Sequence, residues 1–200
     1  MKRTFLLSLL GTGLAIAASA FAPAAQAHGM TSLAGCASPA LAPALSAFGD
    51  PRSYFVAPGG DFESSHHGWQ LTGGAALAAG SGPLRRGTVR SLRLPAGATA
   101  TSPVFCVDLD YPTFRFFHAR GASPLSVDVI YPSLGAKKPK ATSVAGGSTS
   151  WKLSKDVSLR PERVTRDWGW RYVQLRFVAA TGAKGDWVVD DVLVDPRMRG

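Results

Sequence analysis

The chain has 200 residues with a formal net charge of +9, and 46% of its residues are hydrophobic, which is the size and composition of one globular domain. The basic residues are scattered, with the densest cluster at 137–140, and this distribution predicts solubility and weak attraction to anionic polymers rather than nucleic-acid binding. No long helical periodicity is visible in the sequence, which excludes a helical bundle.

The first 27 residues have the three parts of a secretory signal peptide. Lys2 and Arg3 form a basic start, residues 5–22 are apolar or small, and the sequence Ala-Gln-Ala at 25–27 offers a cleavage site. An apolar run of this length is also compatible with a membrane anchor. We expect cleavage after Ala27, which places the mature chain outside the cell or in the cell envelope with no membrane span.

Two cysteines, Cys36 and Cys106, are present, and an even count in an exported chain predicts one disulfide bond. The bridge would close a loop of about 70 residues, for which chain entropy gives a stabilisation of roughly 4 kcal/mol. A competing interpretation needs the same sulfur, because the sequence Leu-Ala-Gly-Cys at 33–36 resembles a lipobox, whose cysteine carries a lipid.

Residues 28–57 show no sustained helical or strand period and contain several prolines, among them Pro39, Pro43 and Pro51. We expect an extended N-terminal arm that Cys36 fixes to the rest of the domain. A short turn of helix is expected around residues 41–48.

From residue 58 to about residue 197, short apolar alternations are separated by Gly, Pro and Ser, a pattern typical of an all-β sandwich. A half-buried strand places successive side chains on opposite faces, as Val173, Leu175 and Phe177 do by alternating with polar neighbours. The pattern predicts two stacked antiparallel sheets with about eight to ten strands in total. The clearest strands are expected at 69–71, 75–78, 91–94, 99–107, 113–120, 125–131, 172–177 and 187–194.

The last of these strands changes its apolar phase. Trp187 and Val189 share one face, whereas Val192 and Val194 share the other. A β-bulge inserts one extra residue into a strand and restores the phase. We therefore expect a bulge or kink at residues 190–191.

Two local motifs stand at the ends of the β region. The first is Gly-Asp-Phe-Glu at 60–63, followed by Trp69 and Gly74, and the second is the sequence from Trp187 to Val192. This combination resembles the jelly-roll carbohydrate-binding modules of the galactose-binding-like fold, over roughly residues 50–196. It is also similar to a group of exported bacterial proteins with a similar two-cysteine layout.

The resemblance implies that the first and last strands lie side by side, where acidic residues of such modules hold a structural calcium ion. By position, Asp61 or Glu63 would face Asp190 or Asp191. Calcium takes six to eight oxygen ligands from carboxylates and carbonyls, so the chemistry is suitable. The alternative is that these residues are polar members of a bulge that bind backbone amides.

In modules of this fold, exposed aromatic rings stack on sugar faces. Trp168, Trp170 and Tyr172 form an alternating aromatic stripe, and Trp151 lies in a Gly/Ser-rich region. An aromatic ring offers an apolar face with a polar tip, so these four residues are candidate ligand-binding residues. The alternative is that the stripe faces the core, where we expect Trp69 and the tryptophan of the closing motif.

The sequence offers little support for catalysis. His66 and His67 are adjacent, and neighbours in a strand point to opposite faces, so they make a poor metal pair. Asp108 and Asp110 share a strand face and, with Glu63, are the carboxylates available to a hydrolase. The sequence has neither the G-x-S-x-G motif of serine hydrolases nor a glycine-rich phosphate-binding loop between a strand and a helix.

The leading hypothesis is an exported, non-catalytic and monomeric jelly-roll sandwich that binds glycan or cell-wall polymer. The second is a structural or protein-interaction domain with no small ligand, and the third is a glycan-acting hydrolase. Glycan binding predicts exposed aromatic rings on one sheet or at its rim, whereas a purely structural role predicts that the tryptophans are buried. A hydrolase predicts two carboxyl groups facing each other across a cleft, within about 10 Å.

Overall fold

The computed structural model describes residues 36–64, 68–84, 89–108, 111, 113–132, 140–144, 148–159 and 170–195. The expected signal peptide and lipobox therefore lie outside the described residues, apart from Cys36. The described part consists of strands and one short 3-10 helix, and none of its helices is long and apolar enough to cross a membrane. The elements are η1 (Ser46–Phe48), β1 (Phe55–Val56), β2 (Gln70–Thr72), β3 (Ala76–Ala79), β4 (Arg90–Leu94), β5 (Thr99–Thr101), β6 (Phe105–Val107), β7 (Thr113–Arg120), β8 (Leu125–Ile130), β9 (Lys140–Val144), β10 (Ser148–Leu153), β11 (Val157–Ser158), β12 (Arg171–Ala179) and β13 (Trp187–Asp195).

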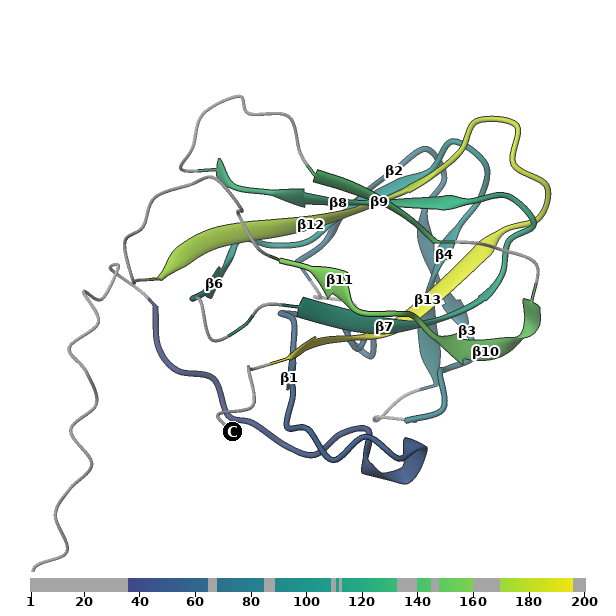
Figure 1. Ribbon diagram of the computed structural model, residues 1–200. Coiled ribbons are helices and arrows are strands. Elements are labelled where there is room, and N and C mark those ends of the chain that lie inside the picture. The colour runs from purple at the N-terminus through teal and green to yellow at the C-terminus, as the bar shows by residue number, and fades with distance from the viewer. Residues whose placement is uncertain are drawn as a thin grey trace, which may run out of the picture.

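The strands form two antiparallel sheets that stack as a sandwich (Figure 1). The seven-stranded sheet has the order β10-β7-β13-β4-β3, with β1 paired to β13 and β11 paired to β7. The six-stranded sheet has the order β2-β5-β12-β8-β9, with β6 paired to β12. This architecture confirms the predicted all-β sandwich of two antiparallel sheets.

The core lies between the sheets and is built by the predicted alternation. On β12, Val173, Leu175 and Phe177 are fully buried, whereas the residues between them are partly exposed. On β7, Phe114 and Phe116 point into the same core, and the ring of Phe116 packs edge-on against Phe177 at 4.9 Å. Burying such side chains contributes about 1.5–3 kcal/mol each, which makes this shared core the main stabilising feature.

The segment predicted as a single strand at 99–107 is divided into β5 and β6. Pro103 has no backbone N–H, so it cannot continue the ladder with β12. Ser102 bridges the break because its N–H donates to the carbonyl of Leu175 at 2.8 Å and its Oγ accepts the N–H of Leu175 at 2.9 Å. The sequence pattern also missed four strands, namely β1, β9, β10 and β11.

The opening segment lies against the closing strand, as the two motifs predicted. The N–H of Ala57 donates to the carbonyl of Val192 at 2.8 Å, and the N–H of Val192 donates to the carbonyl of Gly60 at 2.9 Å. A Cβ atom at Gly60 would come within 2.9 Å of the Cβ of Val192, so only glycine permits this approach. Phe62 joins the same buried core as Val192.

The predicted bulge in β13 is confirmed. The pairing of β13 with β7 shifts register between Asp190 and Leu193, and Asp191 has a φ of 47°, in the left-handed region. Left-handed backbone is unfavourable for most residues other than glycine, and asparagine or aspartate adopts it most readily among them. All nine residues of β13 are buried, so both faces of this strand are covered.

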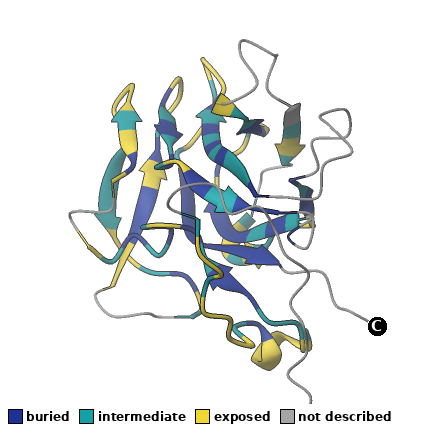
Figure 2. Ribbon diagram, turned by 90° about the vertical axis from the view of Figure 1, so that its left-hand side faces the viewer, coloured by how far each residue is buried: buried dark blue, intermediate teal, exposed yellow. Residues whose placement is uncertain are grey.

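The N-terminal arm covers the outer face of the seven-stranded sheet, below it in Figure 1. Leu45 and Tyr54 of the arm form a second apolar cluster with Phe117 and Leu193 of the sheet, and all four are at most 2% exposed. The expected helical turn at 41–48 is present as the shorter η1, which is exposed at the foot of Figure 2. The arm is therefore docked on the domain, and β1, expected within the arm, is part of the sheet.

Ionic contacts also hold the arm to the sheet. Arg52 of the arm pairs with Asp50 at 2.7 Å and with Asp195 at the end of β13, and Arg115 of β7 pairs with Asp50 at 3.0 Å. The hydrogen bonds from Arg52 hold the pKa of Asp50 well below its usual value. These side chains are largely shielded from solvent, so the network fixes the arm more firmly than exposed pairs would.

The predicted disulfide bond is present. Cys36 and Cys106 are joined, with their Cα atoms 5.7 Å apart and a sequence separation of 70. This bridge connects the start of the described arm to β6 of the six-stranded sheet. It uses the sulfur atom that lipidation of Cys36 would need.

Candidate functional site

The outer face of the six-stranded sheet carries polar side chains, in contrast with the apolar face that the arm covers. The period of two on β12 places Gln174 and Arg176 on the side opposite the core. The same alternation on β8 turns Ser126 and Asp128 outward while Leu125 and its apolar partners point inward. We call this surface the polar face. Its residues are Gln70, Thr72, Thr99, Thr101, Ser126, Asp128, Ile130, Tyr172, Gln174, Arg176 and Val178.

Strand register brings these side chains into rows. Arg176 is paired with Asp128 of β8 on one side and with Thr101 of β5 on the other, and Thr101 is in turn paired with Gln70. Directly opposite residues in an antiparallel sheet have Cβ atoms about 5 Å apart, so the row through Arg176 is a continuous strip of polar groups, whereas the neighbouring rows also contain Ile130 and Val178. The polar face therefore crosses four strands without a large apolar side chain in this row.

An ion pair lies at the centre of the polar face. The guanidinium of Arg176 donates to Oδ2 of Asp128 from Nη2 at 2.6 Å and from Nε at 2.9 Å. Asp128 is only 6% exposed, whereas the side chain of Arg176 is 37% exposed. The pair leaves other N–H groups of the arginine at the surface, where they can donate to a ligand.

Further along β12, Gln174 and Tyr172 continue the face toward the edge of the sandwich. The amide Nε2 of Gln174 donates to the carbonyl of Ser102 at 3.1 Å, which fixes the side chain across the β5–β6 break. Tyr172 is paired with Cys106 of β6 and is partly exposed. Three of the four aromatic residues expected to bind a ligand are among the described residues, and of these three Tyr172 is the one that lies on the polar face.

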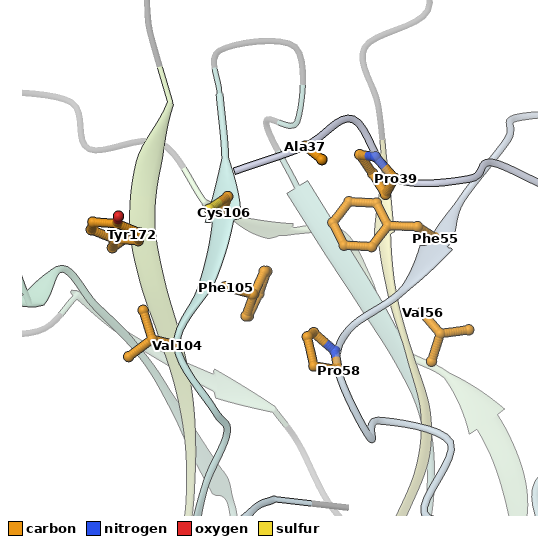
Figure 3. A pocket seen from close by; sticks show the side chains of 9 residues that line it. All are labelled: Ala37, Pro39, Phe55, Val56, Pro58, Val104, Phe105, Cys106 and Tyr172. Carbon is orange, nitrogen blue, oxygen red and sulfur yellow. The ribbon is translucent and has the colours of Figure 1, made fainter. Parts of the chain in front are cut away.

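A pocket of about 440 Å³ opens at this edge, beside Tyr172 and the disulfide (Figure 3). It lies between the arm, β1 and the segment that leads into β6. Its wall is mainly apolar, and its main side chains are those of Pro39, Phe55, Pro58, Val104, Phe105 and Tyr172. Ligand pockets have volumes of about 300–1,000 Å³ and mainly apolar walls, so this one has the size and lining of a binding site.

The other candidate aromatic residues do not form an exposed platform in the described part of the chain. Trp170 is 4% exposed, belongs to the core between the sheets and stacks on Tyr111 at 6.1 Å. The expectation of an exposed ring at Trp170 is thus corrected. Trp151 lies on β10 rather than in a loop and packs, partly buried, on the cluster beneath the arm. Trp168 lies outside the described residues.

The acidic residues of the two motifs meet at the bulge of β13. Asp190 and Asp191 are at most 2% exposed, and both approach the backbone of Gly82. A Cβ atom at Gly82 would lie 3.2 Å from an Oδ2 atom of each aspartate, so a larger residue would crowd the cluster. Glu63 is near enough for its charge to act on Asp190, whereas Asp61 is partly exposed in the turn before Phe62.

Asp190 has an unusual electrostatic environment. Burial raises its pKa to about 8, and the negative charges of Asp191 and Glu63 act in the same direction. Two backbone N–H groups oppose this shift by donating to its carboxyl group, that of Gly82 at 2.5 Å and that of Asp191 at 2.8 Å. At neutral pH the carboxyl group of Asp190 is therefore largely protonated.

The fit of a calcium ion to this cluster can be judged from the same contacts. The donor set is all oxygen, which suits calcium. Both oxygens of Asp190, however, already accept backbone N–H groups, as in the alternative interpretation of the motif. In the part of the chain that the structure describes, no three His, Cys, Asp or Glu side chains are arranged to hold a metal ion. Calcium binding stays a prediction.

The groups considered for catalysis are dispersed or outside the described residues. His66, His67 and Asp110 belong to the undescribed segments, so neither the histidine pair nor the Asp108–Asp110 pair can be placed. His118 is buried between the rings of Phe116 and Trp187, and burial lowers its pKa. Its environment is that of a neutral core histidine.

Comparisons with known proteins give structural similarities at low sequence identity. No protein-family model matches the chain, and no curated protein matches it. A family 11 carbohydrate-binding module from Clostridium thermocellum, solved in complex with a β-1,3-1,4-mixed-linked tetrasaccharide, aligns with a TM-score of 0.44 and 14% identity, covering 70% of this chain and 95% of the module.

Two other modules give similar values. A CBM61 module in complex with β-1,4-galactotriose has a TM-score of 0.41 and 14% identity, over 70% of this chain and 95% of that one. The CBM22-1 xylan-binding domain of Paenibacillus barcinonensis Xyn10C has a TM-score of 0.45 and 12% identity, over 70% and 93% of the two chains.

The main residues of the polar face are not evident as a site from the sequence. The alternation of their strands places Gln174, Arg176 and Asp128 opposite the core, but nothing in the sequence indicates that they lie side by side. The available signal was the polar character of both strands at matching positions. Only strand register shows that the two strands are neighbours.

Proposed function

We propose that this protein is an exported, non-catalytic β-sandwich that binds a glycan polymer of the cell envelope on its polar face. The observation that carries the proposal is the contrast between the two outer faces. The arm seals the face of the seven-stranded sheet, whereas the polar face presents hydroxyl, amide, guanidinium and carboxylate groups across four strands.

The chemistry of the polar face suits a carbohydrate. Sugar hydroxyls both donate and accept hydrogen bonds, and the face supplies donors from Arg176 and Gln174 and acceptors from Asp128 and the threonines. Arg176 and Gln174 are held by Asp128 and by the carbonyl of Ser102, so less side-chain entropy is lost on binding. Tyr172 at the end of the face adds an aromatic ring with a polar tip.

The test is affinity gel electrophoresis of the purified protein in gels that contain a soluble polysaccharide. Mixed-linked glucan, xylan, galactan and solubilised cell-wall glycan are compared, each with and without chelator. We expect at least one polymer to retard the protein. Arg176→Ala and Gln174→Ala should each weaken the retardation about tenfold, since an interaction worth 1.4 kcal/mol corresponds to a factor of 10.

The chain offers a matched control on the other sheet. Arg93 of β4 also pairs with an aspartate, Asp186, at 3.0 Å, but it lies outside the polar face. Arg93→Ala should leave the retardation unchanged. Equal weakening by Arg93→Ala and Arg176→Ala would indicate non-specific attraction to a basic protein, and retardation by no polymer would favour a structural or protein-interaction role.

The non-catalytic part of the proposal has its own measurement. The polysaccharides are incubated with the protein, and reducing ends are counted over time. We expect no increase above the protein-free control. A release of reducing ends that Glu63→Gln abolishes would establish a hydrolase instead.

A further inference from the structure

We propose that the apolar pocket at the edge of the sandwich binds the aliphatic chain of an amphiphile. The polar head of the same ligand would lie on the adjoining polar face, a step that rests on the proposed function. The chain-binding step is independent of it, because it depends on the pocket alone. No residue of the pocket belongs to the acidic cluster or to the ion pair of the polar face.

The pocket has the composition of a hydrocarbon site. Its side chains come from phenylalanine, proline, valine, alanine and a disulfide-bonded cysteine, and Tyr172 is the lining residue whose side chain carries a polar group. Val104, in the loop before β6, is 47% exposed at this wall, whereas the valines of β6, β8 and β12 are less exposed. An exposed apolar side chain beside a concave apolar wall marks a surface that gains free energy when it is covered.

The lining residues of the pocket come from several elements. Tyr172 comes from β12, Phe105 from β6, Val104 from the loop before β6, Phe55 from β1 and Pro39 from the arm (Figure 3). The volume of about 440 Å³ is within the range of ligand pockets, and the apolar side chains around it suit an aliphatic chain.

The walls of the pocket are held in place before any ligand binds. The disulfide fixes the arm at Cys36, one residue before Ala37, and the hydrogen bond from Ala57 to Val192 fixes β1. Pro39 and Pro58 restrict the backbone further, since proline has a fixed φ. A rigid apolar pocket binds with less loss of conformational entropy than a flexible one.

Tyr172 connects the pocket to the polar face. Its neighbours on β12 in the outward direction are Gln174 and Arg176, and its partner on β6 is Cys106. An amphiphile with its chain in the pocket would therefore pass the phenol group at the junction and meet polar groups beyond it. This continuity is the reason for assigning an amphiphile rather than a simple hydrocarbon.

The experiment is calorimetric titration of the purified protein with n-hexyl, n-heptyl and n-octyl β-glucoside below their critical micelle concentrations, with glucose as the chain-free reference. The head group is constant, so differences in affinity report the chain. A buried methylene contributes about 0.8 kcal/mol, so we expect the affinity to rise about fourfold for each added methylene. An affinity that does not depend on chain length would overturn the proposal.

The site is assigned with a pair of matched variants. Val104→Glu places a charge at the rim of the pocket, and Val89→Glu places one at another exposed valine, 62% accessible and away from the pocket. We expect Val104→Glu to abolish the dependence on chain length and Val89→Glu to preserve it. A chain-length dependence that survives Val104→Glu would show that the chain binds elsewhere. Thermal unfolding of both variants confirms that each is folded, since both positions are exposed.

The outcome is separable from that of the proposed function. Arg176→Ala should retain the chain-length dependence of the alkyl glucosides while it weakens retardation by polysaccharide. Val104→Glu should lose the chain-length dependence and keep the retardation by polysaccharide. Failure of the polysaccharide experiment with a preserved chain-length series would remove the glycan proposal alone, and the reverse result would remove the pocket proposal alone.

Discussion

The two sheets of this sandwich follow the same period of two, but their outer faces differ in solvent exposure. On the seven-stranded sheet the outward side chains of Phe117 and Leu193 are at most 1% exposed, because Leu45 and Tyr54 of the arm pack over them. On the six-stranded sheet the outward side chains of Gln174 and Arg176 remain partly exposed and polar.

The role of a sheet face therefore depends on what covers it as well as on its own residues. A two-sheet sandwich needs one apolar face per sheet, and the seven-stranded sheet has two. Its second apolar face is buried by the arm, and the disulfide and the ion pairs of Arg52 attach the arm to the domain. The outer face of the six-stranded sheet, which the described part of the arm does not cover, is the one that we propose to bind a ligand.

The largest effect is expected from truncating an outward residue on the covered face. Phe117→Ala should destabilise the protein by about 3–5 kcal/mol, because it removes a buried ring and leaves a cavity under the arm. Tyr172→Ala, on the open face, should cost about 1 kcal/mol or less, as expected for a partly exposed side chain. Urea denaturation of both variants measures the difference.

Equal losses in the two variants would contradict the contrast between the faces. A small loss for Phe117→Ala would mean that the arm does not pack on the sheet in solution. A large loss for Tyr172→Ala would mean that the phenol is part of the core and not of a binding surface.

Much of this fold follows from the sequence, because burial between two sheets imposes a period of two. The limits of the strand at 113–120 agree with the structure, and the phase change in the last strand correctly predicts the bulge at Asp190. The strands β1, β9, β10 and β11 were missed because each pairs at a sheet edge or within the arm, where few apolar residues alternate. These strands form because they pair with strands distant in the chain, and a local sequence pattern carries no information about such partners.

The candidate site was less predictable than the fold. The stripe of Trp168, Trp170 and Tyr172 suggested a platform, but Trp170 turns inward to stack on Tyr111, which a strict alternation does not predict. The polar face combines residues of β2, β5, β8 and β12, so it depends on strand order. The pocket depends on the path of the arm, and Cys36 is the single point at which the sequence predicts a contact between the arm and the domain.

A second way to break the contrast is to release the arm. Replacing both cysteines by serine removes the bridge across 70 residues, and we expect a loss of about 2–4 kcal/mol. The loss should be accompanied by weaker binding of octyl β-glucoside, because Ala37 and Pro39 form part of the pocket wall. Denaturation and calorimetry of the double variant measure the two effects.

Retardation by polysaccharide is the control for the double variant. The polar face is held by β-sheet register and does not contain the bridge, so the folded double variant should keep its affinity for the polymer. A loss of polymer binding equal to the loss of glucoside binding would show that the two surfaces are one site.

The smallest change in unfolding free energy, taken per pH unit, is expected from one buried aspartate in each sheet. Asp128 is paired with Arg176, whereas Asp190 is held by two backbone N–H groups and is repelled by neighbouring carboxylates. The pKa of Asp190 is raised to about 8 in the folded protein and returns to about 4 on unfolding. Its contribution to stability is therefore present at low pH and is lost as the pH rises toward 8.

Asp190→Asn should remove this dependence on pH. Between pH 5 and 8, the wild-type protein should lose up to about 1.4 kcal/mol per pH unit relative to the variant, because the unfolded aspartate is ionised and the folded one is protonated. Asp128→Asn should instead cost about 1 kcal/mol throughout this range, since it breaks an ion pair that is partly exposed. Urea denaturation at several pH values measures both effects. Parallel curves of stability against pH for the wild type and Asp190→Asn would contradict the raised pKa of Asp190.

The same series with added calcium tests the predicted calcium site. A bound cation would favour the ionised carboxylates and would therefore stabilise the wild type most at high pH. Asp190→Asn should weaken this stabilisation.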